Sequence, residues 1–190
     1  MLSRLRLLIK ISGSHLIARR YFVVNGFDGA LAMMGLLVGF YTSNPVELNV
    51  VINACMGAAI ALAMSGISSA YISESAEKQQ ELKALEDAMI TDLRESAFGQ
   101  ASRIMPLVIA IVNGFSPLLF ALLIMTPLLL FNQISTPITT PIESAMMVAL
   151  LLIFSLGIFI GRISGLFWLW AGLRALFIAL VTSTMIFLFI

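Results

Sequence analysis

Long apolar runs dominate the chain, and short polar stretches separate them. Five runs cover residues 22–41, 46–71, 104–131, 142–161 and 166–190. A helix rises about 1.5 Å per residue and the hydrocarbon core of a bilayer is about 30 Å thick, so each run is long enough to cross it. The pattern therefore predicts an all-α integral membrane protein with five transmembrane helices.

A charged segment, residues 72–103, separates the second predicted span from the third. No glycine or proline interrupts the chain between Tyr71 and Phe98, so we expect the second helix to continue beyond the membrane. Apolar residues recur there at three- and four-residue steps, which predicts one apolar face on a short cytoplasmic helical extension. These residues are Leu82, Leu85, Met89 and Leu93.

The first twenty residues are basic and only briefly apolar. Lys10 breaks the run from Leu7 to Ile11, and no small-residue cleavage site precedes the next span. The segment is too short to cross a membrane. Residues 1–20 are therefore predicted to form a basic amphipathic helix on the membrane surface, not a signal peptide.

The composition agrees with a membrane protein. Hydrophobic residues make up 60% of the chain and charged residues 11%, against about 25% charged in soluble domains. The single cysteine, Cys55, excludes an intrachain disulfide. The chain carries no hydrolase, metalloprotease or P-loop motif. We therefore expect neither an enzyme nor a tightly bound cofactor, and no nucleic-acid partner.

The basic residues give the predicted orientation. Loops 42–46 and 132–141 and the C-terminus contain no lysine or arginine, whereas the other side of the membrane collects every basic residue except Arg174, which lies inside a span. Cytoplasmic loops are enriched in lysine and arginine. The sequence predicts a multi-pass protein of the plasma membrane, with a cytoplasmic N-terminus and an external C-terminus.

The most unusual residue in the first span is Asp28, the only charged residue between Phe22 and Tyr41. A carboxylate at membrane depth costs about 2.5–3.5 kcal/mol on insertion scales. It must face a partner, a water-filled cavity or a cation. Gly26 and Gly29 flank it and allow a helix or ion to come close. The alternative is an aspartate that only forms a hydrogen bond across a helix interface.

Arg174 lies at a similar depth to Asp28. Asp28 follows Arg20 by eight residues, about 12 Å along a helix, and Arg174 follows Gly165 by nine. The two side chains could form a structural ion pair. Alternatively, a cation or a proton competes with Arg174 for Asp28. The sequence does not decide between these readings.

Two further patterns bear on function. The tetrapeptide Val-Asn-Gly-Phe occurs at residues 24–27 and again at 112–115, which suggests a parallel duplication of a two-helix unit followed by a fifth helix. Glu74, Glu77 and Glu81 share one helix face, and carboxylate oxygens at this density suit a divalent metal. The alternative is a solvated helix face on which Glu74 pairs with Lys78.

The methionines admit two readings as well. The chain contains eleven, of which Met64 and the Met33–Met34 pair are the best candidates for soft metal ligands. Methionine is also ordinary filler in a membrane core.

Taken together, these motifs resemble the vacuolar iron transporter family, especially its short prokaryotic and archaeal members. The similarity rests on four stretches and covers most of residues 19–190. They are Arg20-Tyr-Phe-Val-Val-Asn-Gly-Phe-Asp28-Gly29-Ala-Leu with Gly35 and Gly39, the second-helix stretches 57–66 and 69–77, Ser116-Pro117-Leu-Leu, and Gly172-Leu-Arg174.

The resemblance implies a homodimer that exports Fe²⁺ or Mn²⁺ from the cytosol in exchange for protons. Asp28 would be the intramembrane metal ligand and proton carrier, with Met64 as a second ligand. The transport path would also include Asn25, Asn113 and Arg174. The segment after the second span is short, about 30 residues. Its metal ligands would be Glu74, Glu77, Glu81, Glu86 and Met89.

Two other classes of protein remain. One is a non-transporting membrane scaffold or metal sensor that uses residues 72–103 as a surface for a partner. The other is an exporter of an organic solute, which would need a larger polar cavity than these spans are expected to line.

Overall fold

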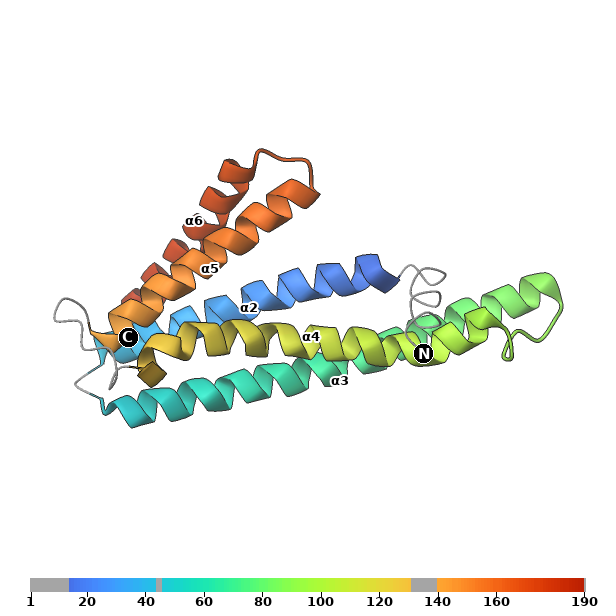
Figure 1. Cartoon of the computed structure of the whole chain (residues 1–190), viewed down its shortest axis with the longest axis horizontal. Helices are drawn as coiled ribbons and strands as arrows, with labels where there is room; N and C mark the ends of the chain where they lie inside the picture. The colour runs from blue at the N-terminus through green and yellow to red at the C-terminus, as the bar shows by residue number, and fades with distance from the viewer. Residues whose placement is uncertain (1–13, 44–45, 131–139, 190) are drawn as a thin grey trace.

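The computed structural model describes residues 14–43, 46–130 and 140–189, which form five helices (Figure 1). All five are long and apolar enough to cross a membrane, which confirms the predicted all-α membrane fold. Of the predicted surface helix, residues 1–13 lie outside the described residues, and residues 14–20 form the start of the first spanning helix. The helices are α2 (Ser14–Thr42), α3 (Leu48–Met89), α4 (Ala97–Leu130), α5 (Pro141–Ile163) and α6 (Trp168–Phe189).

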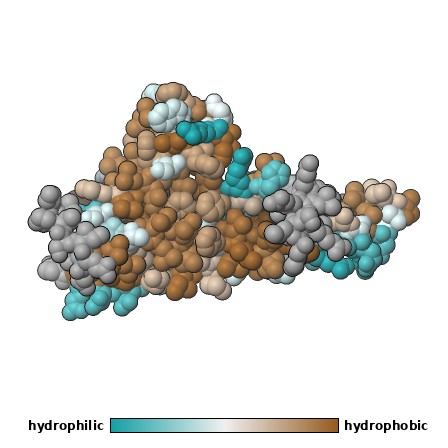
Figure 2. Space-filling model, viewed as in Figure 1, coloured by the Kyte–Doolittle hydropathy of each residue, from teal (hydrophilic) through white to brown (hydrophobic). Residues whose placement is uncertain are grey.

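Two antiparallel helix pairs make up most of the molecule. Figure 1 shows α3 and α4 as a long pair whose connected end projects past α2. The other pair, the α5–α6 hairpin, lies against α2 at one end and diverges from it toward its own turn. We call the end where α2 begins, α5 ends and α6 begins the basic end, because it carries Arg19, Arg20 and Arg162. Figure 2 shows hydrophobic residues over the middle of the molecule and hydrophilic ones near the helix ends.

The predicted extension of the second span is present. Helix α3 runs without a break from Leu48 to Met89, about 60 Å at 1.5 Å per residue. It ends at Ile90, whose left-handed backbone (φ 52°) directs its N–H to the Glu86 carbonyl. The Glu86 carboxylate accepts a hydrogen bond from the Leu93 N–H at 3.0 Å. Glu86 therefore closes the turn that leads into α4.

Close backbone contact joins α3 to α4. At Gly114 of α4, a Cβ atom would lie 2.4 Å from the Ala63 carbonyl oxygen of α3. Only glycine fits this distance, and small residues at such crossings let helices pack where lipid gives no hydrophobic drive. Helix α4 also contains Pro106, Pro117 and Pro127, and Pro117 meets α2 at Gly29 in the same way.

The apolar core occupies the half of the bundle away from the basic end. Its fully buried side chains come from all five helices, and the largest include Met33, Leu37, Ile124, Met125 and Ile153. Met33 and Met34 are therefore core residues. This core anchors the hairpin where α2 ends, and it leaves the hairpin free to diverge from α2 at the basic end.

Candidate functional site

The Asp28 side chain lies on the outer surface of α2. It is exposed, and it follows the half-exposed Val24 by one helical turn, so both residues share a face. No other described residue forms a hydrogen bond or an ion pair with its carboxylate. The alternative of an aspartate bonded across a helix interface within one chain therefore does not hold for the described residues.

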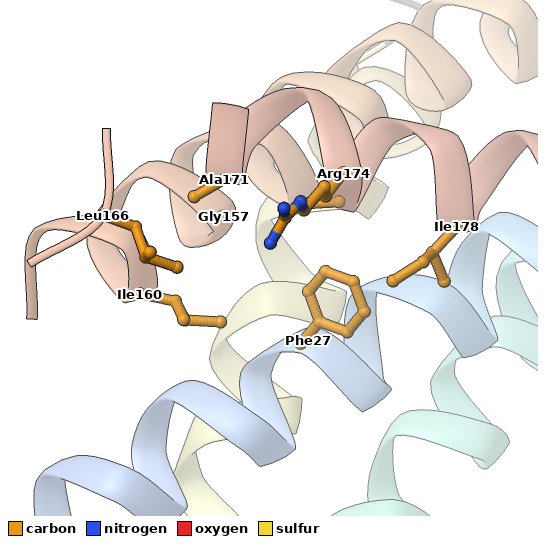
Figure 3. Close-up of a pocket in the computed structure, with 8 residues that line it drawn as sticks. Phe27, Gly157, Ile160, Leu166, Ala171, Arg174 and Ile178 are labelled. Atoms are coloured by element: carbon orange, nitrogen blue, oxygen red, sulfur yellow. The ribbon is translucent and has the colours of Figure 1, made fainter. Parts of the chain in front are cut away.

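A cleft separates α2 from the α5–α6 hairpin at the basic end. It consists of two cavities that share Ile160, which we call together the hairpin cleft. The outer cavity, of ≈ 340 Å³, is lined by Leu16, Arg19, Arg20, Val23, Val24, Ile160, Ile163 and Ser164. The inner cavity, of ≈ 250 Å³, is lined by Phe27, Gly157, Ile160, Leu166, Ala171, Arg174, Ala175 and Ile178. In Figure 3 the Arg174 guanidinium points from α6 into the inner cavity.

The positions of Asp28 and Arg174 along the membrane follow from how α2 lies beside α6. Phe27 and Ile178 line the same cavity, and Gly35 approaches Ile186. The same sequence offset relates both pairs, so the two helices run parallel. Arg174 is then level with Val23, about 7 Å closer to the basic end than Asp28. The two residues form no salt bridge, so the structural ion pair is not formed.

The two repeated asparagines meet in the middle of the bundle. The Asn25 side-chain amide donates to the Asn113 side-chain oxygen and to the Tyr21 carbonyl, the latter at 3.1 Å. Asn113 is 3% exposed and donates to the Gly66 carbonyl at 2.8 Å. A buried amide costs free energy unless it is paired. This chain of bonds ties α2, α3 and α4 together at one level.

None of the described cavities and ion pairs joins Met64 to Asp28. The Met64 side chain is 57% exposed on α3. Helix α3 packs on α4 and, among the described helices, makes no contact with the hairpin.

The predicted glutamate set is not assembled in the described part of the chain, which contains no group of three metal-ligating side chains. Glu74 is 2% exposed, and its Oε2 atom has no hydrogen-bond partner among the described residues. Tyr21 of α2 interacts with it electrostatically. Glu77 and Glu81 are exposed, and Glu81 pairs with Lys78 at 2.7 Å. Lys78 therefore neutralises Glu81, not Glu74 as the alternative reading expected.

Glu86 and Met89 belong to the α3–α4 turn. The Glu86 carboxylate accepts a hydrogen bond from the Leu93 N–H, and Met89 is 58% exposed at the helix end. Asp92, in the same turn, accepts a hydrogen bond from the Arg94 N–H at 2.8 Å. That bond lowers the pKa of the Asp92 carboxyl below its usual value. The carboxylates of Glu86 and Asp92 thus both accept hydrogen bonds from the backbone of the turn.

Sequence reasoning missed the hairpin cleft. Arg19 and Arg20 were not interpreted as part of a binding site, and nothing in the apolar pattern of α5 and α6 indicates that the hairpin leaves α2 at this end. The one available signal was an arginine pair placed two to three turns before Asp28 on the same helix.

Comparison with known proteins gives limited information. The sequence matches no protein family model, and no solved structure matches it. It is similar to the uncharacterized protein MJ0645 of Methanocaldococcus jannaschii, with 28% identity over 148 residues, which cover 76% of this chain and 74% of that protein.

Proposed function

We propose that the protein exports a divalent transition metal, Fe²⁺ or Mn²⁺, from the cytosol in exchange for protons. The observation that carries the proposal is Asp28, a carboxylate on the surface of a spanning helix that has no partner in the described part of the chain. Against lipid this group would cost about 2.5–3.5 kcal/mol. A bound cation or a proton removes that cost, and the two would neutralise the same oxygen atoms in turn.

A second copy of the chain completes the proposed site. One chain offers a single carboxylate at this depth, and a divalent metal needs several ligands. A homodimer that packs through the Asp28 face of α2 would bring two such carboxylates together and shield them from lipid. Met64, exposed on α3, could then supply a soft ligand from the partner.

The remaining predicted residues take supporting roles in this proposal. Arg174 places a positive charge about 7 Å from the level of Asp28, which favours release of the metal and reloading of the carboxylate. Asn25 and Asn113 hold α2 against α4. Glu74, with its unpartnered oxygen, and the exposed Glu77 attract cations at the basic end. The excess of basic residues makes this end cytoplasmic.

The proposal is tested by Mn²⁺ uptake into proteoliposomes loaded with a metal-sensitive dye. Asp28→Asn removes the charge with little change in shape and should reduce uptake to the rate of empty vesicles. Asp87→Asn is the matched control, because Asp87 is exposed near the end of α3, and it should transport like the wild type. Mn²⁺ uptake by Asp28→Asn at the same rate as by Asp87→Asn and the wild type would refute the role of Asp28.

One observation favours the alternative of a scaffold or sensor. The projecting end of α3 exposes Leu85, Met89 and Ile90, the last of these 92% exposed, and such residues can bind a partner protein. In that case Mn²⁺ would bind to the purified protein without crossing the vesicle membrane.

A further inference from the structure

We propose that the hairpin cleft binds an anionic phospholipid of the leaflet at the basic end. The phosphate would contact the arginines of the cleft, and an acyl chain would cover its apolar wall. This inference concerns Arg19, Arg20 and Arg174, and it stands whether or not the protein transports metal.

The cleft carries three positive charges. Arg19 and Arg20 line the outer cavity, and Arg174 lines the inner one. None of the three forms a salt bridge with a described residue. Arg20 lies 5.6 Å from the centroid of the Tyr21 ring, a contact that leaves its N–H donors available. Guanidinium groups bind phosphate through paired hydrogen bonds, so an anion is the natural partner.

The rest of the lining is apolar. Phe27, Ile160 and Ile178 face the inner cavity around Arg174 (Figure 3), and Leu16 and Ile163 face the outer one. A soluble anion would satisfy the arginines but leave these walls uncovered. A neutral lipid would cover the walls but leave the arginines unpaired. An anionic phospholipid does both.

The depth of the cleft suits a lipid headgroup. Trp168 and Trp170 begin α6 and are 43% and 64% exposed, and tryptophan gathers at the membrane–water interface. Trp170 and Arg174 also line a third cavity, of ≈ 360 Å³, one helical turn apart. Arg174 is therefore about 6 Å deeper than Trp170, and its long side chain can reach back to the level of the phosphate.

The same charge argues against metal entry through this cleft. Three arginines repel a divalent cation, so Fe²⁺ or Mn²⁺ would approach Asp28 from another side. Basic pockets between spanning helices at the cytoplasmic face are known to hold anionic headgroups. The hairpin cleft has the charge, the apolar wall and the depth of such a pocket.

Native mass spectrometry of the full chain in detergent tests the proposal, because it resolves bound lipids and subunit number together. Phosphatidylglycerol should bind much more tightly than phosphatidylcholine. Arg174→Gln should weaken phosphatidylglycerol binding about fivefold, the change that corresponds to one basic residue at an anionic lipid surface. The double variant Arg19→Gln/Arg20→Gln should weaken it more. Arg174→Lys should restore most of the loss.

Arg103→Gln is the matched control, since Arg103 is exposed on α4 and lines none of these cavities. It should bind phosphatidylglycerol like the wild type. Circular dichroism melts of every variant show whether each one is folded. A folded Arg174→Gln that binds phosphatidylglycerol normally would overturn the proposal.

Three other outcomes would also overturn it. Equal binding of the two lipids would make the cleft a non-selective apolar groove. Displacement of phosphatidylglycerol by inorganic phosphate would identify a site for soluble anions. A change in the monomer–dimer ratio with unchanged lipid binding would show that a second copy of the chain fills the cleft.

Discussion

Asn25 donates a side-chain hydrogen bond to Asn113, which occupies the equivalent place in the second Val-Asn-Gly-Phe sequence. The helices that carry them, α2 and α4, run parallel, with α5 packed on α2 and α3 packed on α4. This is the arrangement expected if a two-helix unit had been duplicated in parallel. The repeat thus places two polar groups where each satisfies the other in the apolar interior.

Removing the Asn113 amide should destabilise the protein. Asn113→Ala leaves the Asn25 side chain and the Gly66 carbonyl without this partner, and we expect a loss of about 1–2 kcal/mol. Asn53→Ala is the control, because Asn53 is exposed on α3, and its effect should be small. Thermal melts in detergent compare the two variants. An unchanged melting temperature for Asn113→Ala would contradict the role given to this network.

The close contact between α3 and α4 predicts opposite effects of the same substitution at two glycines. Gly114→Ala should cost about 2 kcal/mol, because the new Cβ would overlap the Ala63 carbonyl oxygen. At Gly57, on α3, a Cβ would meet nothing within 4 Å. Gly57→Ala should therefore stabilise the helix by up to about 1 kcal/mol. The same substitution is thus expected to have opposite signs at the two sites, and melts of both variants check this. Equal effects would mean that the helices do not cross as described.

The turn after α3 offers a test that separates structure from metal binding. Glu86→Ala removes the acceptor of the Leu93 N–H, so hydrogen exchange should accelerate in residues 90–96. Glu86→Gln keeps an acceptor oxygen and should retain most of the protection. Mn²⁺ affinity should be unchanged in both variants. A lower Mn²⁺ affinity of Glu86→Gln would show that Glu86 is a metal ligand.

The sequence was sufficient to predict the helices and insufficient to predict the site. Bilayer thickness fixes how long an apolar run must be, so the five spans could be predicted directly. The extension of α3 followed from the absence of glycine and proline between Tyr71 and Phe98. No comparable rule predicts from the sequence how the helices pack side by side. Which residues lie beside Asp28 depends on how the helices pack, and the apolar cluster that joins α2 to the hairpin includes Leu37 and Ile153.

The glutamates illustrate the same limit on a smaller scale. Glu74, Glu77 and Glu81 share one helix face by spacing alone. Burial separates them, because Glu74 faces Tyr21 of α2 whereas Glu81 remains at the surface with Lys78. The spacing of residues along a helix predicts which face they share, but not which neighbouring helix covers part of that face.

The central claim is that Asp28 carries a metal ion and a proton in turn, and coupled fluxes test it most directly. In proteoliposomes that report internal Mn²⁺ and internal pH together, wild-type protein should drive Mn²⁺ uphill when a proton gradient is imposed. It should also move protons when only a Mn²⁺ gradient is present. Folded Asp28→Asn should do neither. Mn²⁺ and proton fluxes in Asp28→Asn that equal those of the wild type would contradict the account.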